Sequence, residues 1–372
     1  MNKFFLIINL LILITPILCA KETEVLIYGY VEGYYSRDNT KIDPENSQNE
    51  ESYIRPYVIG GSKNNQFGLN YVLLGADVTS DVYRATLKMG TGEVAEQYFP
   101  LNGLLHEAYC GFQILDNLWL DAGFFLTNLC IESYYTYENP LSIFSIPGYV
   151  SEFYHTGARL SYEPTEELTF SAACIDAYSE FGDNNEDKSL SLFAEYLDSN
   201  INIYYASSIG NERPPDMEKA LFMHHNLNFA FYGIGSFDFI TQLDLITQSK
   251  NNPTDNGLNT SYYYSVAQWL SYYFTDQLYC SVRCTYFNNE TNPLINTNLE
   301  GDLPATKGYS LGAGFTYAPT ETSFLRVEGN YLNFDKSNLE SFVFQDGSSK
   351  MNSRYELLFS YGIKFDIFNN NK

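Results

Sequence analysis

The chain has 372 residues, a net charge of −24 and an aromatic content of 17%, with 33 tyrosines and 27 phenylalanines. The acidic excess argues against nucleic acid as a partner, because its phosphates would be repelled. Aromatic residues fit the pleated, half-buried surface of a sheet better than they fit helices, so the composition favours an all-β fold.

The first 20 residues have the order of a secretory signal peptide. A short charged start ends at Lys3, an apolar run extends from Phe4 to Leu18, and Ala20 offers a small residue for cleavage. The run is too short for a good membrane-spanning helix, which needs about 20 apolar residues. We therefore predict that residues 1–20 are removed during export. Lipid attachment at Cys19 is the less favoured alternative, because a leucine precedes it.

After this segment, stretches of about ten residues alternate polar and apolar side chains. In residues 83–90, Leu87 and its apolar partners fall on one face, whereas Arg84 and Lys88 fall on the other. A period of two residues places successive side chains on opposite sides of a strand. The same alternation recurs in residues 278–286, 309–317 and 355–365.

Short polar turns and long loops alternate along the chain. The short turns are residues 79–81, 116–117, 163–167, 198–200, 233–236, 275–277 and 318–321. The long loops are residues 36–65, 92–104, 127–152, 177–187, 210–221, 249–259, 288–305 and 333–354. Outer-membrane barrels have short periplasmic turns and long extracellular loops, and only a closed sheet pairs every backbone group in lipid.

This rhythm predicts that residues 21–372 form a single outer-membrane domain. We expect it to be a closed antiparallel up-and-down transmembrane β-barrel of about 16 strands. A large soluble β-sandwich is the alternative, since its strands would alternate too. A barrel of about 16 strands leaves an aqueous bore.

Several segments resemble the OmpL-like β-barrel porin family known as porin-2. They are YGYVEGYY at residues 28–35, EAYCG at 107–111, LWLDAGFF at 118–125, IES at 131–133 and YHTGARLSYEP at 154–164, within a region of similarity from residue 26 to 177. The sequence departs from the family pattern at Leu126, Thr127, Asn128 and Cys130. The resemblance implies a channel in the bacterial outer membrane and carries over no catalytic residues.

We therefore predict a porin that lets small hydrophilic solutes or ions diffuse passively, with no enzymatic activity, metal or cofactor. The expected partners are outer-membrane lipid, the barrel assembly machinery and those solutes, while a homotrimer is left open. A non-conducting barrel acting as a surface receptor or adhesin is the alternative. A lipid hydrolase would need Ser310 of the GYSLG pattern as nucleophile, yet Ser310 lies in an alternating strand and not at a strand-to-helix turn.

Charged residues on the polar faces of these strands are the predicted pore lining. They are Glu32, Arg84, Lys88, Glu107, Asp121, Arg159, Arg283, Arg326, Glu328 and Lys364. The third long loop is predicted to fold inward and narrow the bore with Glu132, Glu138 and Glu152. Three carboxylates in a confined passage would favour cations, although the inward arginines could instead make the pore mildly anion-selective.

The remaining histidines and cysteines do not form an evident chemical site in the sequence. His224 and His225 are neighbours on a predicted strand, so they should point to opposite faces and cannot share one metal ion. We interpret Cys110, Cys174, Cys280 and Cys284 as small apolar residues of the sheet, because Cys280 and Cys284 are too far apart along one strand to bridge.

Overall fold

A computed structural model describes residues 23–39, 55, 57–178, 181–183, 185–215, 217–249, 260–293, 303, 305–335, 344–345 and 350–370. The predicted signal peptide, residues 1–20, lies outside these ranges. Among the helices in the described ranges, none is long and apolar enough to cross a bilayer.

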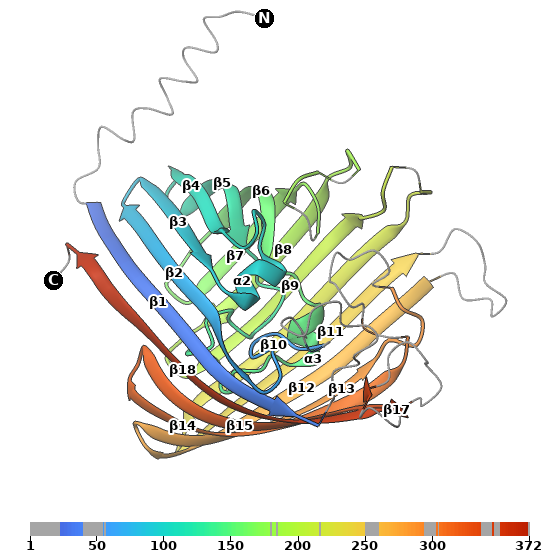
Figure 1. Ribbon diagram of the computed structural model, residues 1–372. Helices are drawn as coiled ribbons and strands as arrows, with labels where there is room; N and C mark the ends of the chain where they lie inside the picture. The colour runs from blue at the N-terminus through green and yellow to red at the C-terminus, as the bar shows by residue number, and fades with distance from the viewer. Residues whose placement is uncertain are drawn as a thin grey trace, which may run out of the picture.

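Sixteen strands form a closed barrel in which each strand pairs antiparallel with its neighbour in the chain, and the last strand returns to the first (Figure 1). The wall strands are β1 (Thr23–Asp38), β2 (Gln66–Ser80), β3 (Tyr83–Thr91), β4 (Leu105–Leu115), β5 (Leu118–Leu126), β6 (Tyr154–Tyr162), β7 (Leu168–Ile175), β8 (Ser189–Leu197), β9 (Ile201–Asn211), β10 (Leu221–Ile234), β11 (Phe237–Ser249), β12 (Thr260–Thr275), β13 (Leu278–Asn288), β14 (Lys307–Thr320), β15 (Ser323–Phe334) and β18 (Ser353–Asn369). The predicted closed barrel of about 16 strands is therefore confirmed.

The connections follow the predicted rhythm of short turns and long loops. β2 and β3, for example, are joined by a two-residue turn, whereas β5 and β6 are joined by residues 127–153. The long connections also hold α2 (Glu93–Tyr98), α3 (Ile146–Val150) and a small ribbon of β16 (Phe344–Gln345) with β17 (Lys350–Met351). β1 and β18 pair from Leu26 with Asn369, at the rim that carries the short turns, to Asp38 with Glu356, so they close the wall along their length.

The wall separates an apolar outer face from a polar inner face. Leu87, Val282 and Leu311 are about half exposed on the outside, as expected for side chains that meet lipid. Their neighbours Arg84, Arg283 and Ser310 turn inward. The strict period of two in the sequence thus corresponds to two different solvents on the two sides of one sheet.

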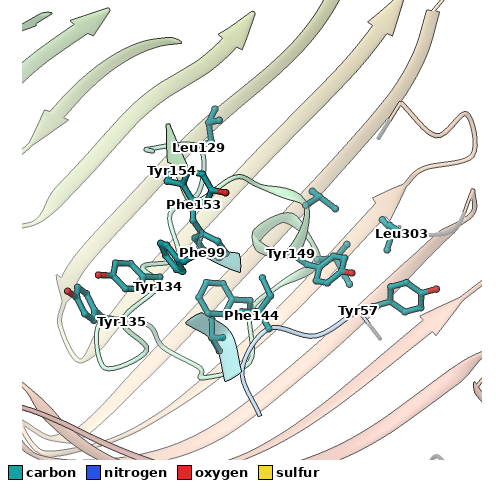
Figure 2. Close-up of a cluster of buried hydrophobic side chains, with 14 of the residues drawn as sticks. Tyr57, Phe99, Leu129, Tyr134, Tyr135, Phe144, Tyr149, Phe153, Tyr154 and Leu303 are labelled. Atoms are coloured by element: carbon teal, nitrogen blue, oxygen red, sulfur yellow. The ribbon is translucent and has the colours of Figure 1, made fainter. Parts of the chain in front are cut away.

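Much of the buried apolar surface lies inside the barrel and comes from the long loops. Tyr57, Phe99, Tyr134, Phe144 and Phe153 belong to the first three long connections, and Figure 2 shows them gathered within the wall. Figure 1 places α2 and α3 in the same interior space. The bore is therefore partly filled by packed loop side chains. The alternation of polar and apolar residues in the wall strands does not predict this packing.

Candidate functional site

The third long connection, residues 127–153, lies across the interior and is called the inner loop below. The backbone N–H of Ile131 donates to the Gln242 side chain on β11 at 3.2 Å. Farther along, the backbone N–H of Ser142 donates to the Glu328 carboxylate on β15 at 2.6 Å. The inner loop thus bridges two separate sectors of the wall.

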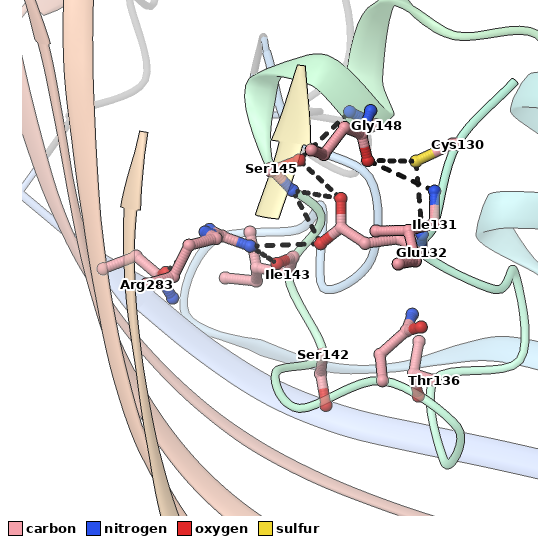
Figure 3. Close-up of polar contacts among 12 residues, drawn as sticks. Cys130, Ile131, Glu132, Thr136, Ser142, Ile143, Ser145, Gly148 and Arg283 are labelled. Atoms are coloured by element: carbon pink, nitrogen blue, oxygen red, sulfur yellow. Dashed lines mark hydrogen bonds and ion pairs between the residues drawn. The ribbon is translucent and has the colours of Figure 1, made fainter. Parts of the chain in front are cut away.

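Glu132 organises the end of the inner loop that precedes α3. Its carboxylate accepts hydrogen bonds from the Ser145 backbone N–H at 2.9 Å and from the Ser145 hydroxyl at 2.5 Å, as Figure 3 shows. A Cβ atom at Gly148 would meet this carboxylate, so a larger residue there would displace the Glu132 side chain. Arg283 of β13 approaches Glu132 to 3.4 Å. Burial raises the pKa of the Glu132 carboxyl, while Arg283 and the Ser145 hydrogen bonds oppose that rise.

Two wall residues of β15 hold the backbone of the inner loop. The Arg326 guanidinium donates to the Thr136 carbonyl at 3.2 Å and to the Asn139 carbonyl at 2.8 Å. Glu328 accepts from two loop N–H groups, at Ser142 and Ile143. Both wall side chains are buried, so their charges are compensated by loop dipoles and by neighbouring charges rather than by water.

A further arginine that was not predicted anchors the first long connection. Arg55 lies 2.9 Å from the Glu356 carboxylate of β18 and 3.5 Å from that of Asp38 on β1. It is buried and also donates to the Gly61 carbonyl. An arginine in a loop gives no periodic signal, which is why sequence patterning did not mark it.

A different sector of the wall, formed by β3 to β6, carries three more of the predicted basic residues. Arg84 and Arg159 both contact the buried Asp121 carboxylate, at 2.7 and 3.0 Å. Their side chains keep 20% exposure each. Lys88 forms an ion pair with Glu107 at 2.6 Å. Wall carboxylates therefore offset part of the charge of this basic sector, and its arginines remain partly accessible.

The last two predicted pore residues lie near the join between β1 and its neighbours. Glu32 is fully buried and accepts hydrogen bonds from the Tyr30 hydroxyl and the Asn70 amide. The Lys364 ammonium lies 4.3 Å from the centroid of the Tyr28 ring. All ten predicted pore residues thus lie on the inner side, but the structure divides them into buried anchors and partly exposed groups.

Two cavities lie beside the inner loop, with volumes of about 170 Å³ and 360 Å³. Both contact Ile131 and Glu132 of the loop and Tyr232 of β10. Among the described residues, the charged side chains lining them are all acidic: Glu132, Glu138 and Asp238 for the smaller cavity, and Glu132, Glu152 and Glu195 for the larger. Asp238 and Glu195 were missed by sequence analysis, because each lies near a short turn where alternation fades.

The two neighbouring histidines point to opposite faces, as predicted. His224 lies inside, 2.7 Å from the Tyr178 hydroxyl and 3.1 Å from the Asp244 carboxylate. His225 lies on the outer face beside the Tyr205 hydroxyl at 2.7 Å. Within the described part of the chain, no three His, Cys, Asp or Glu side chains are grouped so that they could hold a metal ion.

The serine of the GYSLG pattern lies in a strand, as predicted. Ser310 is the fourth residue of β14 and lies opposite Thr285 of β13 and Leu332 of β15. Its hydroxyl is buried, and no helix follows it within the described residues up to Asp335. The sharp strand-to-helix turn that exposes a hydrolase nucleophile is therefore missing at this position.

The sequence matches the family described as putative β-barrel porin-2, OmpL-like, over residues 24–365. A comparison with curated proteins gives no match.

Solved structures of similar fold include an anion-selective porin and other outer-membrane proteins. The anion-selective porin from Comamonas acidovorans has a TM-score of 0.61 at 9% identity, with 92% of this chain and 100% of that chain covered. OmpF of Salmonella typhi, in complex with daunomycin, has a TM-score of 0.59 at 14% identity, with 92% and 97% covered. OmpT of Vibrio cholerae in a trimer form has a TM-score of 0.54 at 11% identity, with 93% and 100% covered. At these identities the likeness concerns the fold.

Proposed function

This chain belongs to the OmpL-like β-barrel porin-2 family and is an outer-membrane porin, and we propose that its water-filled passage runs beside the inner loop and prefers cations. Small hydrophilic solutes diffuse through it passively. Residues 1–20 act as the export signal, in line with their charged start and apolar run. Assembly as a homotrimer is part of the same proposal, and the trimer form of OmpT supports it by likeness of fold.

The acidic lining of the two cavities carries the proposal. Among the residues that the structure describes, five carboxylates and no lysine or arginine line the two cavities, and of the five only Glu132 is paired with an arginine named above, Arg283 behind the lining. Glu138 is exposed to the interior, and Asp238 and Glu195 face it from the wall. Between low-dielectric walls the field of such groups is focused and less screened than in bulk water, so cations should concentrate there.

The four inward arginines offset only part of the negative field of the cavity carboxylates. Arg283 and Arg326 are buried under the inner loop and bonded to it. Arg84 and Arg159 share Asp121, which cancels part of their charge. These four arginines therefore do not balance the carboxylates that line the cavities.

The zero-current potential of the purified porin in planar bilayers under a KCl gradient tests this proposal. The wild type should be more permeable to K⁺ than to Cl⁻. Glu138→Gln combined with Glu195→Gln should lower the permeability ratio about two- to fivefold, which corresponds to about 0.5–1 kcal/mol of electrostatic energy.

Glu321→Gln is the matched control, because this carboxylate lies in the short turn between β14 and β15. It should leave the ratio unchanged. Equal ratios in the wild type and the double variant would remove the two cavities from the ion path. A folded barrel without conductance would instead favour the surface receptor.

A further inference from the structure

The smaller cavity beside the inner loop has an aromatic lining. Its five rings are Tyr137 of the loop, Tyr232 of β10, Trp269 and Tyr273 of β12, and Tyr279 of β13. The volume of about 170 Å³ has room for several water molecules, and so for an ammonium ion carrying a few methyl groups.

Cross-strand pairing explains why the rings gather there. Tyr273 and Tyr279 are paired residues on β12 and β13, and their ring centroids lie 5.0 Å apart. Trp269, Ser271 and Tyr273 line the cavity from one face of β12, and Trp269 pairs with Ile240 of β11. Because side chains two residues apart share a face, β12 alone supplies two of the rings.

Carboxylates stand at the edge of these rings. Asp238 accepts a hydrogen bond from the Tyr273 hydroxyl at 2.7 Å and another from the Gly233 N–H at 2.8 Å. Glu138 lies exposed on the loop side of the cavity. Arg326 reaches the Tyr279 hydroxyl at 3.3 Å, but it is 1% exposed and bonded to loop carbonyls, so it does not line the cavity.

We propose that this cavity is a binding site for small alkylammonium cations passing through the channel. The faces of tyrosine and tryptophan rings attract cations within about 6 Å, and aromatic cages bind quaternary ammonium groups in this way. A bare alkali ion gains less, because it stays hydrated, whereas methyl groups on nitrogen also pack against the rings. The inference rests on the proposed cation-preferring passage and adds a ligand class to it.

Choline chloride added to the mature porin in planar bilayers provides the test. Choline should reduce the K⁺ current in a saturable manner, and its uncharged isostere 3,3-dimethyl-1-butanol should reduce it much less at equal concentration. Tyr232→Leu should weaken the choline block about fivefold, whereas Tyr232→Phe, which keeps the ring, should stay within about twofold. Asp238→Asn should weaken it about tenfold.

Tyr109→Leu is the matched control, since Tyr109 is an inner-wall tyrosine of β4 that lies under Arg159 and does not line this cavity. Choline should block the K⁺ current of this variant as strongly as that of the wild type. Circular dichroism establishes that every variant is folded. Equal choline block in Tyr232→Leu, Tyr232→Phe and the wild type would overturn the aromatic site. A cation-selective wild type that choline does not block would also overturn the aromatic site, but it would leave the proposed function standing. A wild type without cation selectivity would overturn both the aromatic site and the proposed cation preference.

Discussion

Two sectors of the inner wall carry arginines that look alike in the sequence yet differ in their surroundings. Arg283 on β13 is 3% exposed and lies under the inner loop, where it contacts Glu132. Arg159 on β6 keeps 20% side-chain exposure and shares Asp121 with Arg84. Both sit on the polar face of an alternating strand, so the strand pattern alone does not distinguish them.

The difference teaches that the loops decide which inward charges meet water. A wall residue that the inner loop covers must satisfy its hydrogen bonds with loop atoms, because an unpaired buried charge costs several kcal/mol. A charged wall residue that the loop leaves uncovered can have part of its charge uncompensated by protein groups, since water and salt screen that part. Inner-wall charge therefore anchors the loop in the covered sector, and in the proposed passage it would set the electric field elsewhere.

The largest effect is expected from breaking the anchor on the covered side. Arg283→Met leaves the buried Glu132 carboxylate without its cation, which should cost about 3–5 kcal/mol in the free energy of unfolding. Arg159→Met should cost about 1 kcal/mol or less, because Asp121 keeps Arg84 and water reaches the site. Urea unfolding in lipid vesicles measures both values. Arg283→Met with Glu132→Gln should recover part of the loss, and equal losses for the two single arginine variants would contradict the distinction.

A somewhat smaller effect is expected from placing a charge on the lipid-facing side of a strand instead of its inner side. Leu87→Arg places a cation on the lipid-facing side of β3 and should destabilise the barrel by about 2–4 kcal/mol if it lies near the bilayer midplane. Thr86→Lys on the inner side should cost much less, because Thr86 faces the Asp77 carboxylate at 2.8 Å. The same unfolding measurement applies. Comparable damage from both substitutions would indicate a sheet buried on two sides.

The sequence was sufficient for the wall because a sheet between lipid and water leaves a period of two in every strand. Residues 83–90 and 278–286 show this, and their strands β3 and β13 lie where it placed them. The interior was harder to predict. Arg55 and Phe99 lie in loops, where no repeat shows which side chains turn inward, and their burial depends on contacts with distant strands or loops.

The acidic candidates of the inner loop show the same limit. Glu132, Glu138 and Glu152 were indistinguishable as carboxylates of one loop, but Glu132 is bonded to Ser145 and Arg283, whereas Glu138 is exposed. Asp238 and Glu195 join the lining because β11 and β8 place them beside the inner loop. Residue type and loop length predict that charge enters the bore, while packing decides which charges remain available to ions.

The smallest effect is expected from removing charge on the uncovered side, and it links the two roles of the wall. Arg159→Gln deletes a cation that is partly accessible but already paired with Asp121. The porin should become more selective for K⁺ over Cl⁻, and by less than the opposite change in the Glu138→Gln, Glu195→Gln variant, because Arg84 and Asp121 still compensate each other. Zero-current potentials at 0.1 M and 1 M salt measure the shift. It should shrink at the higher concentration, where the screening length falls from about 10 Å to about 3 Å. A shift larger than that of the double variant would place the β3 to β6 sector, rather than the two acidic cavities, at the narrowest part of the ion path.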